Sequence, residues 1–342
     1  MKIEEAIMAR HVRASTVVSA VLIVLMRLDA NHDAKGQGNP IRIVTGLRAT
    51  SQSLGWIGTE AGIFKGHGLE VRFPKMETAG PEAAAGLVRG DWDFAEVGAA
   101  PVIQGVLDGH DTVILLAALK PMRKGFVVVR RGITEPGQLN GGRYGVLTEA
   151  GQTGLRARAL LRGWGITATL VPLGTFPKIY AALAAGEIDA GALSDEYRIA
   201  GQRKFGFNAL PVEDPAFLPP VLSTTRRLIS TKRGLVANAV QGYVESIHLF
   251  KTNRSVAVPL LERYLQIFDR KTIEDIYELF SAQFQKLPLP SSAGIQNLLN
   301  EFASKYPAAP TLPHTAVADM SFLEELERSG ILDRLYGDGK KE

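Results

Sequence analysis

Polar side chains gather at places where the sequence predicts that a helix begins. Three of these predicted helix starts lie near Ser53, Pro101 and Thr153. Each start offers unpaired backbone N–H groups and the positive end of a helix dipole, which together make a natural binding site for an anion. One hydroxyl group at a helix start is usually only an N-cap, worth ~1 kcal/mol. The three starts taken together favour a site that binds an anion.

The candidate ligand-binding residues come from these starts and from the loops beside them. Trp56 and Tyr197 are included because an aromatic ring can stack on a flat ligand, although core packing is the alternative for both. The full set is Thr50, Ser51, Gln52, Ser53, Trp56, Gly98, Ala99, Ala100, Thr148, Gln152, Thr153, Asp195 and Tyr197.

Acidic residues lie in the same predicted loops, namely Glu149, Asp195 and Glu196. Paired carboxylates could serve acid–base catalysis or hold a cationic ligand. They could equally be solvated or pair with Arg48, Lys120 or Arg123, and this simpler interpretation is preferred. The acids nevertheless argue against assuming that the ligand is a simple inorganic anion.

Motifs for catalysis, metals and cofactors are missing from the sequence. The chain has no cysteine, so thiolate nucleophiles, thiolate zinc sites and disulfides are excluded. Its six histidines show no metal-ligand spacing, and there is no P-loop, nucleophile elbow or dinucleotide-binding glycine motif. We therefore predict no catalytic residue, no metal site and no cofactor.

One phrase of sequence occurs twice and suggests which elements position the candidate residues. Leu, Gly and Asp recur 96 residues apart as Leu87, Gly90 and Asp93, then as Leu183, Gly186 and Asp189. Each copy predicts a helix that ends at a glycine, an acidic turn and a short apolar strand. Ligands of open α/β sheets bind beyond the carboxyl ends of the strands, so residues 98–100 and 194–196 are expected on opposite walls of one cleft. The alternative is two unrelated βα units in a larger enzyme.

Length and composition are consistent with this arrangement. A chain of 342 residues is too long for one typical core, so two lobes are expected. Its 46% hydrophobic and 22% charged residues are ordinary for a soluble protein. The net charge is only +4, and no basic stripe is interleaved with aromatic residues, so nucleic-acid binding has little support.

The N-terminal residues 1–34 are predicted to be a signal peptide or N-terminal anchor followed by a linker. Arg10 and Arg13 precede an uncharged run over 14–26, whose length fits a signal peptide and falls short of the ~20 residues that span a bilayer. Residues 28–30 make a poor cleavage site, so an uncleaved anchor is the alternative. Both interpretations favour export, and the basic flank argues against a buried core helix.

Strands and helices then alternate, which predicts an α/β fold. Crossings between the lobes are expected at 120–125 and 219–225, which assigns 40–122 and 222–342 to lobe I and 123–221 to lobe II. The expected strands include 41–44, 69–73, 112–119, 126–129, 144–147, 169–172 and 208–211. The expected helices include 54–64, 81–89, 154–164, 176–185, 233–251, 254–268, 272–284, 291–305 and 319–329.

The order of these elements resembles the substrate-binding proteins of the nitrate/sulfonate/taurine class of ABC importers, a class that also covers binders of thiamine-pyrimidine precursors. The resemblance covers nearly all of residues 40–337. It is most telling over 55–71 (GWIGTEAGIFKGHGLEV) and 87–101, and the stretches 132–139, 243–253 and 319–336 also fit. It implies a two-lobed type II periplasmic-binding-protein fold with two hinge crossings and a helical C-terminal segment.

The resemblance also implies a function. The chain would be the exported, periplasmic solute-binding component of an ABC importer, a monomer that captures a small organic anion such as a sulfonate or carboxylate and delivers it to a membrane permease. The alternatives are a binder of a nitrogen heterocycle and a cofactor-free enzyme on the same fold, either a lyase that uses Glu149 or Asp195 or a desulfinase-like protein. Related desulfinases and pyrimidine synthases rely on cysteine, which this chain lacks.

Overall fold

The computed structural model describes residues 40–120, 124–213, 218–266 and 268–337, which belong to one compact unit. The predicted signal peptide or anchor at 1–34 lies outside the described residues, as do residues 121–123 of the first predicted crossing. Within these ranges no helix has both the length and the apolar character that crossing a membrane requires.

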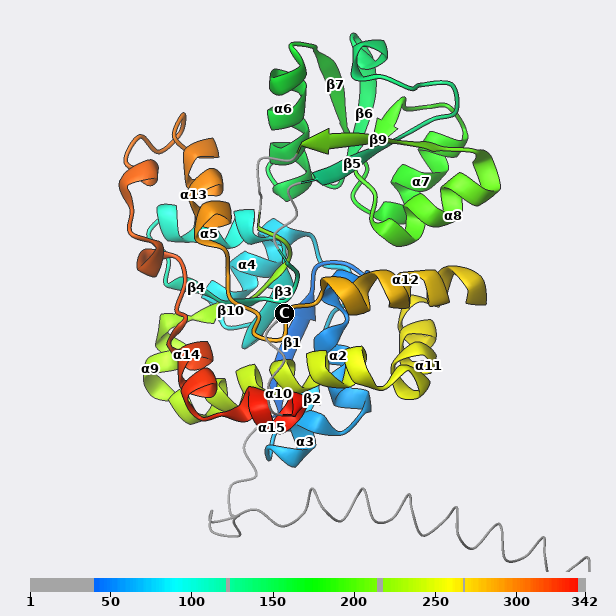
Figure 1. Ribbon diagram of the computed structural model, residues 1–342. Helices are drawn as coiled ribbons and strands as arrows, with labels where there is room; N and C mark the ends of the chain where they lie inside the picture. The colour runs from blue at the N-terminus through cyan, green and yellow to red at the C-terminus, as the bar shows by residue number, and fades with distance from the viewer. Residues whose placement is uncertain (1–39, 121–123, 214–217, 267, 338–342) are drawn as a thin grey trace, which may run out of the picture. The chain divides into compact units, whose positions relative to one another are not determined.

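The strands form two sheets with the same internal arrangement (Figure 1). The strands are β1 (Ile41–Thr45), β2 (Val71–Arg72), β3 (Phe94–Val97), β4 (Thr112–Ala117), β5 (Lys124–Val129), β6 (Gly142–Val146), β7 (Ala168–Pro172), β8 (Ala190–Gly191), β9 (Asn208–Glu213) and β10 (Val221–Thr225). Their orders are β2-β1-β3-β10-β4 and β7-β6-β8-β5-β9. In both sheets the first three strands are parallel and the fourth is antiparallel to both of its neighbours. We call the elements around the first sheet lobe I and those around the second sheet lobe II.

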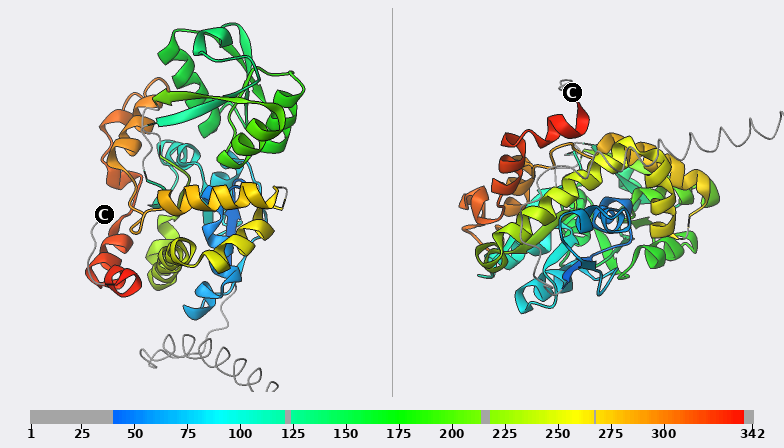
Figure 2. Two further views of the ribbon diagram at one scale, coloured as in Figure 1. Left: turned by 45° about the vertical axis from the view of Figure 1, so that its right-hand side comes forward. Right: turned by 90° about the horizontal axis from the view of Figure 1, so that it is seen from below.

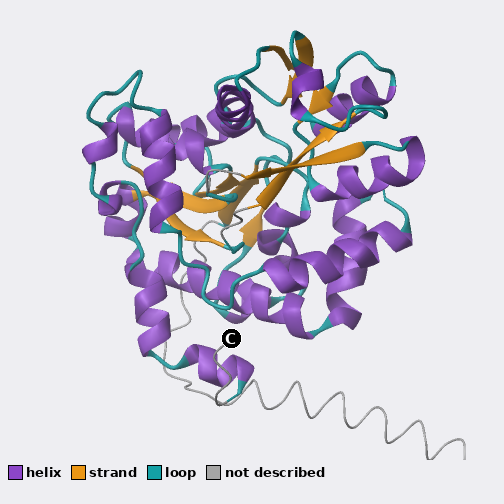
Figure 3. Cartoon of the chain, turned by 45° about the horizontal axis from the view of Figure 1, so that its top comes forward, coloured by secondary structure: helices purple, strands orange, loops and turns teal. Residues whose placement is uncertain are grey.

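Helices cover both faces of each sheet (Figure 3). Lobe I has η1 (Thr50–Gln52), α2 (Leu54–Glu60), α3 (Ile63–Gly66), α4 (Gly80–Arg89), α5 (Ala99–Leu107), α9 (Arg226–Thr231), α10 (Arg233–Thr252), α11 (Arg254–Leu265), α12 (Arg270–Gln283), α13 (Ser292–Glu301), η3 (Ala309–Thr311), η4 (His314–Ala316), α14 (Ser321–Arg328) and α15 (Ile331–Tyr336). Lobe II has η2 (Pro136–Leu139), α6 (Gln152–Trp164), α7 (Phe176–Ala184) and α8 (Asp195–Phe205). In lobe II, α6 lies on one face of the sheet and α7 and α8 lie on the other (Figure 1).

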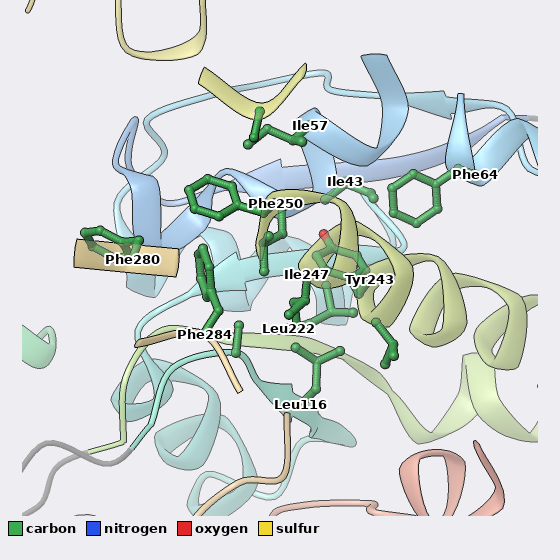
Figure 4. Close-up of a cluster of buried hydrophobic side chains, with 14 of the residues drawn as sticks. Ile43, Ile57, Phe64, Leu116, Leu222, Tyr243, Ile247, Phe250, Phe280 and Phe284 are labelled. Carbon is green, nitrogen blue, oxygen red and sulfur yellow. The ribbon is translucent and has the colours of Figure 1, made fainter. Parts of the chain in front are cut away.

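The two faces of the first sheet carry separate cores because side chains alternate along a strand. Ile43 of β1 joins the cluster formed with α2, α10 and α12, and the next residue, Val44, joins the cluster formed with α4, α5 and α13. Figure 4 shows the first cluster, in which Tyr243 and Ile247 of α10 pack near Ile43. Close packing of α2 on α10 requires Gly58, because a Cβ there would lie 2.1 Å from Ser246 Oγ.

The duplicated phrase marks equivalent places in the two lobes. Gly90 (φ 80°) and Gly186 (φ 72°) both adopt the left-handed conformation just after a helix. β3 and β8, which follow them, are each the third strand of their sheet. The prediction of two related α/β units, one in each sheet, is confirmed.

Several predicted elements differ from the structure in their limits. The predicted helix over 54–64 is interrupted at Gly62, whose φ of 77° separates α2 from α3. The predicted strand over 69–73 is reduced to Val71–Arg72. Residues 221–225, predicted as part of the return crossing, form the fully buried strand β10. The predicted helical C-terminal segment is confirmed, and its last helices, α14 and α15, pack against α10 (Figure 2).

Candidate ligand-binding site

A cavity of about 280 Å³ lies between elements of the two lobes. Its walls include the loops that follow β1 and β3 of lobe I and β6, β7 and β8 of lobe II (Figure 1). These are the carboxyl ends of parallel strands, where an open α/β sheet is expected to bind its ligand. The start of α4, residues 119–120 after β4, the start of β5, residues 218–220 and the C-terminal end of α12 also contribute to the walls.

The starts of α5 and α6 meet at this cavity and are joined by Gln152. The Gln152 side chain accepts a hydrogen bond from the Ala100 backbone N–H at 3.3 Å and donates one to the Leu218 carbonyl at 2.7 Å. Gly98 precedes α5, and a Cβ at this position would lie only 2.7 Å from the Gln152 side-chain oxygen. The structure thus brings together two of the three predicted helix starts, and their dipoles favour an anion between them.

The third predicted start is built differently. A short η1 turn precedes α2, and the buried Ser53 hydroxyl donates to the Thr50 carbonyl at 2.9 Å. Gln52 uses its side-chain oxygen to accept the Leu47 N–H at 2.9 Å, which closes the loop after β1. This loop presents Ser51 and Gln52 to the cavity, while α2 has only seven residues.

The predicted site residues divide according to their place. Those that line the cavity are Ser51, Gln52, Gly98, Thr148, Gln152, Thr153 and Asp195. Those that are buried beside it without lining it are Thr50, Ser53, Ala99 and Ala100. Trp56 and Tyr197 lie elsewhere: Trp56 packs on Tyr264 with ring centroids 5.4 Å apart, and Tyr197 joins an aromatic group that includes Phe176 and Phe268. Tyr197 instead lines a second, narrow cavity of about 10 Å³.

Two basic residues of the cavity wall were not among the predicted ligand-binding residues. Arg156 lies one turn after Gln152 in α6 and donates to the Phe126 carbonyl at 3.2 Å. Lys120 follows β4 and is the first residue of the first predicted crossing. The sequence did carry a signal for Arg156, because residues four apart on a helix share one face and Gln152 was already a candidate.

Asp195 is the acidic group of the cavity wall, and its charge is balanced. Arg198 donates to Asp195 Oδ1 through Nε at 3.0 Å and Nη2 at 2.6 Å, and the Arg198 guanidinium lies 4.7 Å from the centre of the Phe126 ring. Burial raises the pKa of Asp195 above its usual value, and the neighbouring Arg198 opposes this shift. The predicted pairing of this acid with a basic residue is present, although the partner is Arg198 and none of those proposed from the sequence. The basic side chains Lys120 and Arg156 belong to the same cavity wall.

Thr50 connects the two lobes. Its backbone N–H donates to Glu196 Oε1 at 2.7 Å, and its hydroxyl group donates to the same oxygen. Both side chains are buried, with 0% of Thr50 and 1% of Glu196 exposed. Thr50 thus contacts lobe II directly and does not line the cavity.

The rest of the wall is mainly apolar. Its apolar side chains are Leu47, Phe126, Leu147, Phe176, Leu193, Leu218, Pro219, Pro220 and Phe280. No group of acidic or histidine side chains that could hold a metal ion occurs in the part of the chain that the structure describes. The cavity combines a polar region, at the starts of α5 and α6, with apolar walls.

Comparison with family models gives no match for this sequence, and comparison with curated proteins gives none either. Solved structures do match. The alkanesulfonate-binding protein SsuA from Xanthomonas axonopodis pv. citri, bound to MOPS, has a TM-score of 0.67 at 17% identity over 83% of this chain and 100% of that chain. The nitrate-binding protein NrtA from Synechocystis PCC 6803 has a TM-score of 0.69 at 9% identity over 86% and 89%.

The aliphatic sulphonate-binding protein SsuA from Escherichia coli matches with a TM-score of 0.63 at 16% identity over 79% of this chain and 88% of that chain. A Candida albicans protein described as having the generic periplasmic binding protein fold matches with a TM-score of 0.63 at 14% identity. At these identities the likeness concerns the fold. The predicted fold class is confirmed: this chain has the two-lobed α/β fold of the periplasmic binding proteins.

Proposed function

We propose that this protein is the extracytoplasmic solute-binding component of an ABC importer and that it binds a small organic anion. The observation that supports this most strongly is the cavity of about 280 Å³ between the two lobes, with helix starts and basic side chains in its wall. The protein would be exported, act as a monomer and deliver its ligand to a membrane permease. It would have no catalytic role.

The polar region of the cavity supports an anionic ligand. The N–H groups at the starts of α5 and α6 carry partial positive charge, and the basic side chains Lys120 and Arg156 line the same cavity. The charge of Asp195 is balanced by Arg198, which pairs with it. A carboxylate, sulfonate or similar group would be stabilised here by several charge-assisted hydrogen bonds.

The apolar walls support an organic body on the ligand. A volume of about 280 Å³ lies near the lower end of the ~300–1,000 Å³ usual for small-molecule sites. A single inorganic anion would leave the partly exposed side chains of Leu47, Phe126 and Leu147 uncovered. An alkyl or aryl group would bury these side chains from water, at roughly 25 cal/mol per Å² of apolar surface.

The structural neighbours agree with this proposal in general terms. They include proteins described as binding alkanesulfonates, aliphatic sulphonates and nitrate. The apolar walls described above favour the organic anions over nitrate for this chain. An uncharged nitrogen heterocycle would make little use of the partial positive charge at the starts of α5 and α6.

Isothermal titration calorimetry on the purified protein tests the proposal. The panel should contain alkanesulfonates and arylsulfonates of increasing size, the matched carboxylates, nitrate, sulfate and uncharged pyrimidines. We expect at least one organic anion to bind with micromolar or tighter affinity, and nitrate to bind at least tenfold more weakly. Native mass spectrometry should show the same ligand bound and chemically unchanged. Binding confined to uncharged heterocycles, or conversion of the bound molecule, would overturn the proposal.

A further inference from the structure

The loop that follows β1 enters the core of lobe II. Ala49 of this loop is 1% exposed and belongs to the same apolar cluster as Val128, Phe176 and Ile179 of lobe II. Leu47 packs against the same cluster and also lines the cavity. The loop is therefore a lobe I segment whose apolar contacts are made with the other lobe.

The polar contact of the loop is equally specific. The Thr50 N–H and hydroxyl group both donate hydrogen bonds to one oxygen of Glu196, a residue 146 positions later in the sequence. The other oxygen of Glu196 is buried and has no hydrogen-bond partner among the described residues. Nor does Glu196 form an ion pair within the ranges that the structure covers.

The hydrogen bonds that stabilise the buried Glu196 carboxylate both come from Thr50. Removing a charged group from water is costly unless hydrogen bonds replace the lost hydration. Both bonds to Glu196 come from lobe I, whereas Glu196 belongs to α8 of lobe II. If the lobes separate, both bonds are lost and the carboxylate is exposed to water.

Other contacts between the lobes include the packing of Tyr197 on Phe268, with ring centroids 4.9 Å apart, the hydrogen bond from Arg203 to the Thr272 hydroxyl at 2.9 Å, and two ion pairs. Arg162 pairs with Glu301, and Arg203 pairs with Asp275, but these basic side chains are 61% and 39% exposed. Ion pairs exposed to solvent typically contribute ~0–1 kcal/mol. Gln152 bridges to Leu218, but it also forms part of the cavity wall.

We propose that Glu196 is a positioning residue. It holds the 47–50 loop of lobe I against lobe II even when no ligand is bound. In doing so it fixes Ser51 and Gln52 at the cavity. It also sets the fraction of molecules in the closed conformation, in which the two lobes are in contact. The apparent dissociation constant equals the intrinsic constant divided by this fraction. The effect on affinity rests on the proposed function, whereas the effect on the lobes does not.

The test measures the distance between the lobes in the absence of ligand. The chain has no cysteine, so Lys65→Cys and Glu187→Cys, at exposed positions of lobe I and lobe II, can be labelled selectively with nitroxides. Pulsed electron–electron double resonance then gives the distribution of distances between the two nitroxide labels. It is recorded in this labelled background, in Glu196→Leu, in Glu196→Gln and in Thr50→Val. Glu213→Gln, at an exposed position of β9, is the matched control.

We expect the parent and Glu213→Gln to give the same distribution, dominated by one short distance. Glu196→Leu should move most molecules to longer distances, and Thr50→Val should do so in part, since it keeps the backbone N–H. Glu196→Gln should stay close to the parent because its amide oxygen can accept both hydrogen bonds. For an organic anion that binds the parent, Glu196→Leu should raise the dissociation constant about tenfold or more.

An unchanged distance distribution in folded Glu196→Leu would overturn the proposal. Should this variant fail to fold by circular dichroism, Thr50→Val decides: a distribution identical to that of the parent overturns the proposal as well. Because the distances are measured without ligand, they remain decisive even if no anion of the panel binds. Binding with unchanged distances would reject the role of Glu196 and leave the proposed function intact.

Discussion

The carboxylate of Asp189 accepts a hydrogen bond from the Arg143 backbone N–H at 2.9 Å, and the Asp189 N–H donates to the Arg143 carbonyl, also at 2.9 Å. Asp93 makes the same pair of bonds with Arg42 in lobe I, at 2.8 and 2.9 Å. The aspartates of the duplicated phrase therefore fasten β8 to β6 and β3 to β1. They hold the strands whose loops form the cavity, and they do not line it themselves.

Asp189→Ala should destabilise the protein by about 0.5–1.5 kcal/mol, because it removes the acceptor of the exposed hydrogen bonds from the Arg143 N–H and the Arg130 side chain. Burial alone would raise the pKa of Asp189, but the hydrogen bonds from Arg130 and Arg143 lower it below its usual value. A lowered pKa in the folded state stabilises the protein above the pKa of the unfolded state, and this stabilisation is lost as the pH falls. Urea unfolding at pH 7 and pH 3 should show a smaller difference between wild type and variant at pH 3.

Arg156→Gln should weaken binding of the organic anion by about 10- to 100-fold, since a hydrogen bond to a charged group contributes ~1.5–3 kcal/mol. Arg158→Gln is the matched control, because Arg158 lies on the same helix, outside the cavity wall, and bonds the Glu149 carbonyl. Calorimetric titration of both variants separates the effect of the position of Arg156 from the effect of losing one positive charge. Equal losses in both would show that general charge, and not the position of Arg156, attracts the ligand.

Gly98→Ala should reduce affinity at least tenfold with little loss of stability. The new Cβ would lie 2.7 Å from the Gln152 side-chain oxygen, which must move and lose its bond from the Ala100 N–H. Gly163→Ala in α6 meets nothing within 4 Å and should be neutral or stabilising by ~0.4–1 kcal/mol. Thermal unfolding and ligand titration of the pair provide the measurement. Unaltered affinity in Gly98→Ala would show that Gln152 need not hold its position.

Glu96→Gln should make the protein more stable at alkaline pH than wild type. Burial raises the pKa of Glu96 from 4.5 to about 8, although the nearby Gly55 backbone and Tyr243 side chain work against this shift. Since the folded state holds the proton more tightly, its contribution to stability is full below pH 4.5, declines as the pH rises and is lost beyond about pH 8. Melting temperatures between pH 5 and pH 9 should fall more for wild type than for Glu96→Gln. Parallel curves for the two proteins would contradict the raised pKa.

The fold could be predicted because its signals are local. Helices that end at glycines such as Gly90 and Gly186, and short apolar strands between them, are visible in a few consecutive residues. The starts of α5 and α6 could be predicted for the same reason, and they meet at the cavity as expected.

The rest of the candidate site depends on contacts between distant parts of the chain. Thr50 was proposed as a ligand contact, but its hydrogen-bonding groups face Glu196, which no sequence spacing relates to it. Trp56 could stack on a ligand in principle, but the packing of α2 on α11 turns it toward Tyr264. Arg156 could have been predicted from its spacing of four residues from Gln152 on α6, and the structure places both in the cavity wall. The ligand-binding roles themselves stay predictions.

The two sheets are completed at different moments of protein synthesis. All strands of the second sheet lie within residues 124–213, so a ribosome that has passed Glu213 has already supplied every one of them. The first sheet must wait for Val221–Thr225, because β10 lies between β3 and β4. In the meantime the nascent β3 and β4 have a gap between them. Lobe II can therefore complete its sheet first during synthesis, although lobe I begins earlier in the sequence.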